Sequence, residues 1–256
     1  MEVSDEFEQS ERLPVTVDLS PSTGAAVPFV GTQSLGLCWN TEMDTLQVKA
    51  AVKDNPFTRR GLLSNIMTVY DPFGIGAPAM RQAKELQRKV TPRGEKKPNW
   101  DEPLPEDVKP EWNQLLQTME DMQKISIQRA LSPADTGSVI SRRLYCFTDA
   151  SATAVSHVIY LKVVGASGNI LVSFVAGSAL LSPRSCELKG EISIPRAELI
   201  AAESGALAAA SIEKDLKWKL EPTEFFTDST ACLGWIRNRT SRFSICVSNR
   251  RHRTLE

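Results

Sequence analysis

The sequence predicts a mixed α/β protein, and three patterns of apolar residues support that prediction. Two hydrophobic stretches end in the same Phe-Thr-Asp triplet, which places Asp149 and Asp228 where buried strands would deliver a carboxylate to their C-terminal ends. Between them, an alanine-rich run opened by Pro195 has the spacing of a helix that packs on a sheet. Ahead of them, residues 28–128 mix short strand-like and helical segments in an α+β order.

Residues 28–128 are expected to contain a β-hairpin followed by helices. The strand-like segments 35–39 and 45–49 flank a polar connection of hairpin length at residues 40–44. Thr58 is the expected N-cap of the helix that follows the hairpin. Apolar residues at helical spacing predict three helices, at residues 58–70, 78–90 and 111–124. The proline-rich residues 91–110 predict an irregular connector.

After a polar linker at residues 129–141, the pattern changes to strands. Alternation and turn residues predict three strands in a meander, at residues 143–148, 154–164 and 170–175. A helix at 195–214, a strand at 224–227 and a helix that begins at Ser229 complete the expected order. This order of elements is that of a ribonuclease H-type α/β sandwich.

Composition indicates an ordinary globular protein of 256 residues, 41% hydrophobic and 24% charged. We expect four parts: a mostly disordered segment 1–27, a region 28–128, a linker 129–141 and a domain 142–256. No apolar run approaches the roughly 20 residues that span a bilayer, so no membrane partner is expected. The acidic start and five cysteines without Cys-x-x-Cys spacing predict an intracellular location, cytoplasmic or nuclear.

The net charge of −1 conceals basic clusters in the middle and at the end of the chain. Arg237, Arg239 and Arg242 follow the second Asp-containing strand closely, so we expect them along a nucleic-acid backbone. Ser151 and Ser229 are expected to contact a phosphate or sugar, because helix ends bind anions. For the middle cluster, a solvated helix face remains an equal alternative.

The candidate active site consists of Asp149, Glu198 and Asp228. Two aspartates at strand ends and a glutamate early in a helix supply the oxygen ligands that two Mg²⁺ ions require for phosphodiester cleavage. Each aspartate taken alone has an alternative role as a cap or turn former, since Asp before Ser is common there. The three carboxylates in this order, within the longer series of family motifs that follows, favour the metal site.

A longer series of motifs carries a family resemblance. They are Leu35-Gly36-Leu37-Cys38-Trp39-Asn40, Arg60-Gly61-Leu62-Leu63-Ser64, Tyr70-Asp71-Pro72-Phe73-Gly74-Ile75-Gly76-Ala77-Pro78, Trp100-Asp101-Glu102-Pro103-Leu104-Pro105, Phe147-Thr148-Asp149-Ala150-Ser151, Ile194-Pro195-Arg196-Ala197-Glu198-Leu199, Thr227-Asp228-Ser229 and Trp235-Ile236-Arg237. Over roughly residues 28–250 the chain resembles the polymerase polyprotein of BEL/Pao-type long-terminal-repeat retrotransposons. The resemblance implies a reverse-transcriptase palm-end, thumb and connection region followed by a ribonuclease H domain.

The resemblance also implies an activity, which is hydrolysis of the RNA strand in RNA–DNA hybrids. Asp149 would bridge two Mg²⁺ ions, or Mn²⁺ in their place, while Glu198 and Asp228 would flank them. The expected partners are an RNA–DNA hybrid and the remainder of the retroelement polyprotein. No polymerase catalytic motif is present. The family's fourth carboxylate has no counterpart before Glu256, so the domain is expected to be C-terminally truncated and its cleavage impaired.

Two alternative functions remain. The first is a catalytically dead retroelement remnant that acts at most as a nucleic-acid-binding module. The second is an aspartic peptidase built on Asp135-Thr136-Gly137. That chemistry needs two carboxylates that share a proton in an apolar cleft. Because polar linker residues surround the triplet, chance occurrence is the better interpretation of it.

Overall fold

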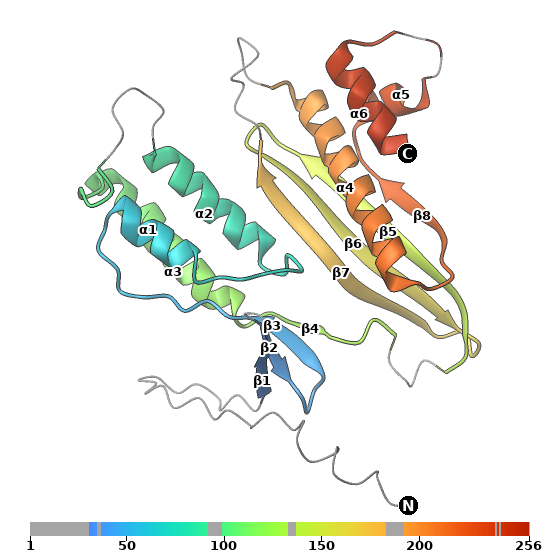
Figure 1. The fold of residues 1–256 in the computed structure, drawn as a ribbon, viewed down its shortest axis with the longest axis horizontal. Coiled ribbons are helices and arrows are strands. Elements are labelled where there is room, and N and C mark those ends of the chain that lie inside the picture. The colour runs from blue at the N-terminus through green and yellow to red at the C-terminus, as the bar shows by residue number, and fades with distance from the viewer. Residues whose placement is uncertain are drawn as a thin grey trace, which may run out of the picture.

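The structure is a computed structural model, and it describes residues 31–34, 37–91, 99–132, 137–182, 192–238, 240 and 242–255. The expected disordered segment 1–27 lies outside the described residues. Within them, helices and two four-stranded sheets make a mixed α/β fold. Figure 1 shows a first region, with a helix group and a small sheet, beside a second region built on a larger sheet.

The small sheet of the first region is antiparallel, in the order β1-β2-β3-β4. Its strands are β1 (Gly31–Ser34), β2 (Leu37–Asn40), β3 (Thr45–Val48) and β4 (Ser126–Gln128). The predicted hairpin is β2 and β3. The side-chain oxygen of Asn40 stabilises its turn by accepting bonds from the Glu42 and Met43 amides, each at 3.0 Å.

Three α-helices and a short 3₁₀ turn form the rest of the first region. They are α1 (Arg59–Ile66), α2 (Ala77–Val90), η1 (Glu106–Val108) and α3 (Lys109–Met122). The predicted N-cap is confirmed, because Thr58 Oγ1 accepts a bond from the Gly61 amide at 3.1 Å. The apolar faces of these helices and Val48 enclose one core, in which Leu62 and Met119 are fully buried.

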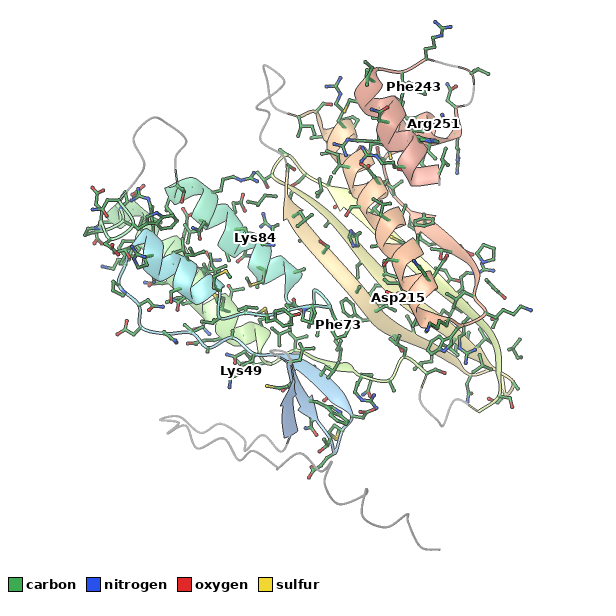
Figure 2. All side chains as sticks on the ribbon, viewed as in Figure 1. Lys49, Phe73, Lys84, Asp215, Phe243 and Arg251 are labelled. Carbon is green, nitrogen blue, oxygen red and sulfur yellow. The ribbon has the colours of Figure 1, made fainter. Side chains whose placement is uncertain are left out.

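The loop between α1 and α2 docks the first region on the second. Asp71 accepts bonds from the Ile75 and Gly76 amides at 3.0 and 2.7 Å, which fixes the start of α2. Gly74 has φ +72° and lies so close to Gly177 that a Cβ atom would fall 1.8 Å from the Gly177 carbonyl oxygen. The Gly177 amide donates to the Phe73 carbonyl at 2.8 Å, where the two regions meet (Figure 2).

The large sheet of the second region has the order β7-β6-β5-β8. Its strands are β5 (Val139–Ala150), β6 (Ala154–Gly165), β7 (Ile170–Leu181) and β8 (Glu221–Phe226). The first three form the predicted antiparallel meander, and β8 pairs parallel to β5. Strand β5 begins inside the expected linker 129–141, because Val139 and Ser141 already pair with Gly165 and Val164 of β6.

Helix α4 (Ile194–Leu216) covers one face of this sheet, on which Leu144 and Cys146 are fully buried. Gly205 permits the close approach, since a Cβ atom there would lie 2.8 Å from Cys146 Sγ. Helices α5 (Thr230–Arg237) and α6 (Ile245–Leu255) pack against α4 (Figure 1). None of the helices in the described part of the chain combines the length and apolar character that crossing a membrane requires.

Candidate active site

The parallel pairing of β5 with β8 brings Asp149 and Asp228 to the same edge of the large sheet. Phe147 of β5 lies opposite Phe226 of β8. Asp149 and Asp228 each lie two residues beyond that pair in the C-terminal direction. Because the carboxyl ends of parallel strands meet at one edge, the two aspartates emerge side by side, and both are exposed.

Glu198 reaches the same edge from the start of α4, through Ser229. The Ser229 hydroxyl donates a hydrogen bond to Glu198 Oε2. The same Oγ accepts a bond from the Cys232 amide at 3.1 Å, which confirms Ser229 as the N-cap of α5. Ser229 directly follows Asp228, so the glutamate is tied to the residue next to the second aspartate.

The donor set fits a hard divalent cation in its chemistry and its placement, since three carboxylates from three elements come to one edge. In the described residues, however, no three His, Cys, Asp or Glu side chains are grouped closely enough to hold a metal ion. One Asp149 oxygen accepts a bond from the Ala150 amide at 2.7 Å, and Glu198 is held by Ser229. Three carboxylates therefore lie at this edge of the sheet, but the described side chains are not grouped closely enough to hold a metal ion. Metal binding is accordingly a proposal.

Buried titratable side chains lie beneath this edge, on the sheet face that α4 covers. Burial, with a smaller contribution from the charge of Glu198, raises the pKa of the Cys232 thiol to about 11. Burial raises the pKa of Cys146 to about 12. Burial lowers the pKa of His157, whose Nδ1 lies 3.2 Å from Ser204 Oγ. These groups are neutral at pH 7. Cys146 and His157 belong to the packing between the sheet and α4, and Cys232 belongs to the packing of α5 against α4.

The five predicted nucleic-acid contacts lie in different settings. Arg237 ends α5, and Arg242 follows it; both are exposed and form no ion pair within the described residues. Arg239 lies outside the described residues. Ser151 is exposed in the β5–β6 turn, where its Oγ accepts a bond from the Ala154 amide at 3.1 Å. Ser229 is 6% exposed and its hydroxyl is already used, so the structure gives it another role.

Sequence reasoning missed a buried charge at Glu203, in the middle of α4. The Glu203 side chain is only 6% exposed, and Arg250 and Arg253 of α6 bind its two carboxylate oxygens, Arg253 at 2.9 Å. These arginines belonged to the basic end of the sequence, but they hold α6 against α4. The signal for Glu203 was its position within the alanine run of the packing helix.

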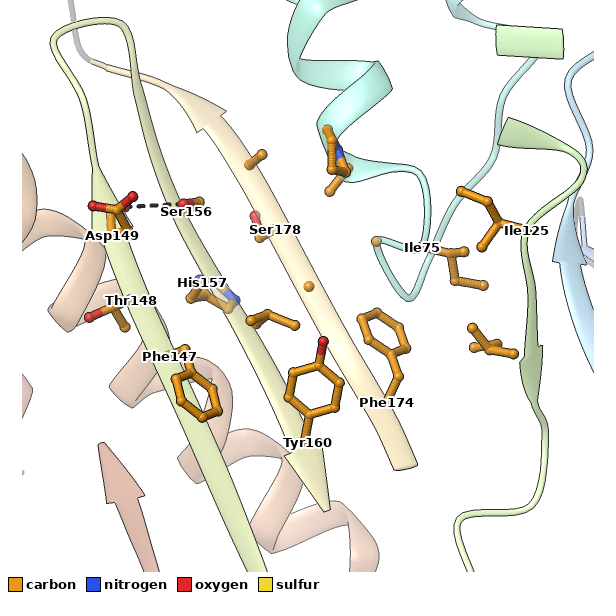
Figure 3. Close-up of a pocket in the computed structure, with 17 residues that line it drawn as sticks. Ile75, Ile125, Phe147, Thr148, Asp149, Ser156, His157, Tyr160, Phe174 and Ser178 are labelled. Atoms are coloured by element: carbon orange, nitrogen blue, oxygen red, sulfur yellow. Dashed lines mark hydrogen bonds between the residues drawn. The ribbon is translucent and has the colours of Figure 1, made fainter. Parts of the chain in front are cut away.

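A cleft with a volume of about 520 Å³ lies beside Asp149, on the sheet face away from α4. Figure 3 shows Phe147, Tyr160 and Phe174 projecting from the sheet, with Ile75 and Ile125 of the first region opposite and Asp149 at one end. The cleft is therefore mainly apolar and aromatic, with a carboxylate at its end. Asp135 and Thr136 of the peptidase-like triplet lie outside the described residues.

Residues 58–229 match the model of a family described as the Pao retrotransposon-like RNaseH-like domain. The match covers more than half of the chain. The chain belongs to this family. The matched span includes all three acidic residues and runs across the expected linker 129–141, so both regions contribute to the family's sequence pattern. The Pao family description assigns a ribonuclease H-like domain to the matched residues, which include strands β5 to β8 and helix α4.

No curated protein matches the sequence. Among solved structures, the chain is similar to a foamy viral protease-reverse transcriptase dRH in complex with double-stranded DNA, with 14% sequence identity and a TM-score of 0.47. That similarity covers 88% of this chain and 35% of the foamy viral chain. The Pao-family chain thus spans about a third of the length of that protein.

Proposed function

We propose that this Pao-family chain is the ribonuclease H-like part of a retroelement polymerase polyprotein and that it hydrolyses the RNA strand of RNA–DNA hybrids with Mg²⁺. The observation that supports the proposal is the convergence of Asp149, Glu198 and Asp228 on one sheet edge through β5, α4 and β8. An accessible edge suits a polymeric substrate, because a duplex cannot enter a closed pocket.

The three carboxylates would hold the Mg²⁺ ions in this proposal, Asp149 from the end of β5, Glu198 from the start of α4 and Asp228 from just beyond β8. The bound ions would activate a water and stabilise the leaving oxygen. The chain's own residues hold the ligands: β5 and β8 fix the aspartates, and Ser229 fixes Glu198. Exposed Arg237 and Arg242 would contact the phosphate backbone.

The test measures Mn²⁺ binding as well as cleavage of a labelled hybrid, so that metal binding and catalysis are followed separately. Asp149→Asn should weaken Mn²⁺ binding and remove the cleavage that Mg²⁺ supports. Asp215→Asn is the matched control. Asp215 is an exposed aspartate on α4, 17 residues beyond Glu198, which places it about 26 Å from Glu198 along the helix axis.

The proposal fails if the wild-type protein binds no Mn²⁺, or if Asp149→Asn and Asp215→Asn behave alike. One observation favours a second function: the described carboxylates form no closed metal cluster. A catalytically inactive nucleic-acid-binding module would bind a hybrid with an affinity that falls steeply with salt, and it would cleave nothing. Substitution of Arg237 and Arg242 by Ala would reduce that salt dependence.

A further inference from the structure

Ser229 lies where three elements of the second region meet. It follows the end of β8, begins α5 and contacts α4. Its side chain is buried, with the residue 6% exposed. Its Oγ accepts the Cys232 amide bond at 3.1 Å, and its single hydroxyl proton goes to Glu198 Oε2. A hydroxyl has one proton to donate, so none remains for a substrate phosphate.

The bond to Glu198 has a geometric consequence. A glutamate side chain has several rotatable bonds, and Glu198 is only half-buried, so packing alone does not fix its carboxylate. Ser229 restrains one oxygen and leaves Oε1 without a hydrogen bond from another described residue. Because Asp228 precedes Ser229, the same contact fixes the distance between Glu198 and the backbone of Asp228.

The elements that Ser229 joins are already packed together. Leu199 of α4, Cys232 of α5 and Val247 of α6 share one small core beneath it, and each is 5% exposed or less. The anchor at Ser229 is therefore rigid, which is what a residue that orients a neighbouring side chain requires.

We propose that Ser229 is a positioning residue, which pre-orients Glu198 beside Asp228 for metal binding. This inference rests on the proposed function, because it assumes that these carboxylates are metal ligands. The simpler reading is that Ser229 is only the N-cap of α5. The two readings differ in what a lost hydroxyl would change: metal affinity as well as stability in the first, and stability alone in the second.

The test compares Mn²⁺ affinity, measured by isothermal titration calorimetry, with the thermal midpoint of unfolding. Ser229→Ala should weaken Mn²⁺ binding by about tenfold, the lower end of the effect of residues that support metal ligands. Ser229→Thr, which keeps the hydroxyl and so the contact with Glu198, should bind Mn²⁺ with nearly the affinity of the wild type. Thr58→Ala is the matched control, because Thr58 is also a buried N-cap but binds no carboxylate. It should lower the thermal midpoint and leave Mn²⁺ affinity unchanged.

Ser229→Gly is a second variant without the hydroxyl, in case Ser229→Ala does not fold. Glycine is tolerated at an N-cap with little loss of helix stability, yet it has no hydroxyl. Weaker Mn²⁺ binding by both Ser229→Ala and Ser229→Gly, with rescue by Ser229→Thr, supports the inference. If Ser229→Gly binds Mn²⁺ as tightly as the wild type, the positioning role of Ser229 is overturned while the proposed metal site stands. Absence of Mn²⁺ binding by the wild type overturns the proposed metal site, and this inference with it.

Discussion

The two regions use apolar residues differently. In the first, helices and a small sheet enclose a core on all sides, so Leu62 and Met119 are fully buried. In the second, α4 covers one face of the large sheet while the other face leaves Phe147 and Phe226 about 40% exposed. The first region is thus closed, whereas the second keeps a sheet face and its strand ends accessible beside the candidate site.

Charged residues show the same contrast. The first region places its ion pairs at the surface, as between Arg60 and Asp101, whose side chains are both 65% exposed. The second region buries Glu203 and holds it with two arginines. Exposed pairs contribute little to stability, while a buried charge depends strongly on its partners. Helix α6 is attached to the second region by this ionic contact and by the small core that Val247 shares with Leu199 and Cys232.

Truncation of one buried leucine in each region should give the largest effects. Leu62→Ala and Leu144→Ala should each lower the free energy of unfolding by about 2–5 kcal/mol, because each leaves a cavity. Since the two leucines belong to separate cores, we expect each substitution to shift a different transition in urea unfolding. Leu63→Ala, at a neighbouring position that is 36% exposed, is the control. A single transition shifted equally by both variants would show that the regions unfold together.

Loss of both arginines on Glu203 should give the next effect. Arg250→Ala with Arg253→Ala leaves a buried carboxylate unpaired, which costs about 3 kcal/mol in the free energy of unfolding. Adding Glu203→Gln should recover part of that loss by removing the charge. Arg251→Ala, on the same helix and away from Glu203, should change stability little. A double variant as stable as Arg251→Ala would mean that Glu203 reaches water.

The sequence was informative wherever local chemistry sets the structure. The repeated Phe-Thr-Asp triplet predicted two strand ends, and parallel pairing then placed Asp149 and Asp228 at one edge. Pro195 and the alanines predicted the packing helix, and the cap preference of Ser predicted the role of Ser229 in α5. Each of these depends on neighbours within a few residues.

Contacts between distant residues could not be predicted in this way. Strand β4 has three residues and exists only because it pairs with β3, some 80 positions earlier. Helix α6 lacks a strong apolar period, since among its described residues Val247 alone is buried. The ion pairs with Glu203 hold this helix on α4. The contact from Ser229 to Glu198 depends on how closely α4 and α5 pack, a distance that no local pattern records.

The free energy of unfolding should depend on pH through His157, which lies on the sheet face that α4 covers. Burial lowers the pKa of His157 in the folded state, so below about pH 6.5 the unfolded chain binds a proton that the folded chain resists. Stability should therefore fall as the pH drops from about 6.5 toward the lowered pKa, and His157→Asn should reduce that slope in urea unfolding between pH 8 and 5.5. His252→Asn, at an exposed position, is the comparison. Equal slopes in wild type and His157→Asn would mean that His157 is accessible to protons in the folded state.

Cysteine reactivity provides the mildest test, because it perturbs nothing before the label is added. The thiolate is the reactive form, and a pKa of about 12 leaves roughly 10⁻⁴ of Cys146 ionised at pH 8. Cys146 is also fully buried under α4, whereas Cys246 on α6 is exposed. Iodoacetamide at pH 8, followed by peptide mass mapping, should label Cys246 in minutes and Cys146 only after denaturation. Labelling of Cys146 as fast as Cys246 in the native protein would mean that α4 does not stay on the sheet, and the contrast between a covered and an open face would be lost.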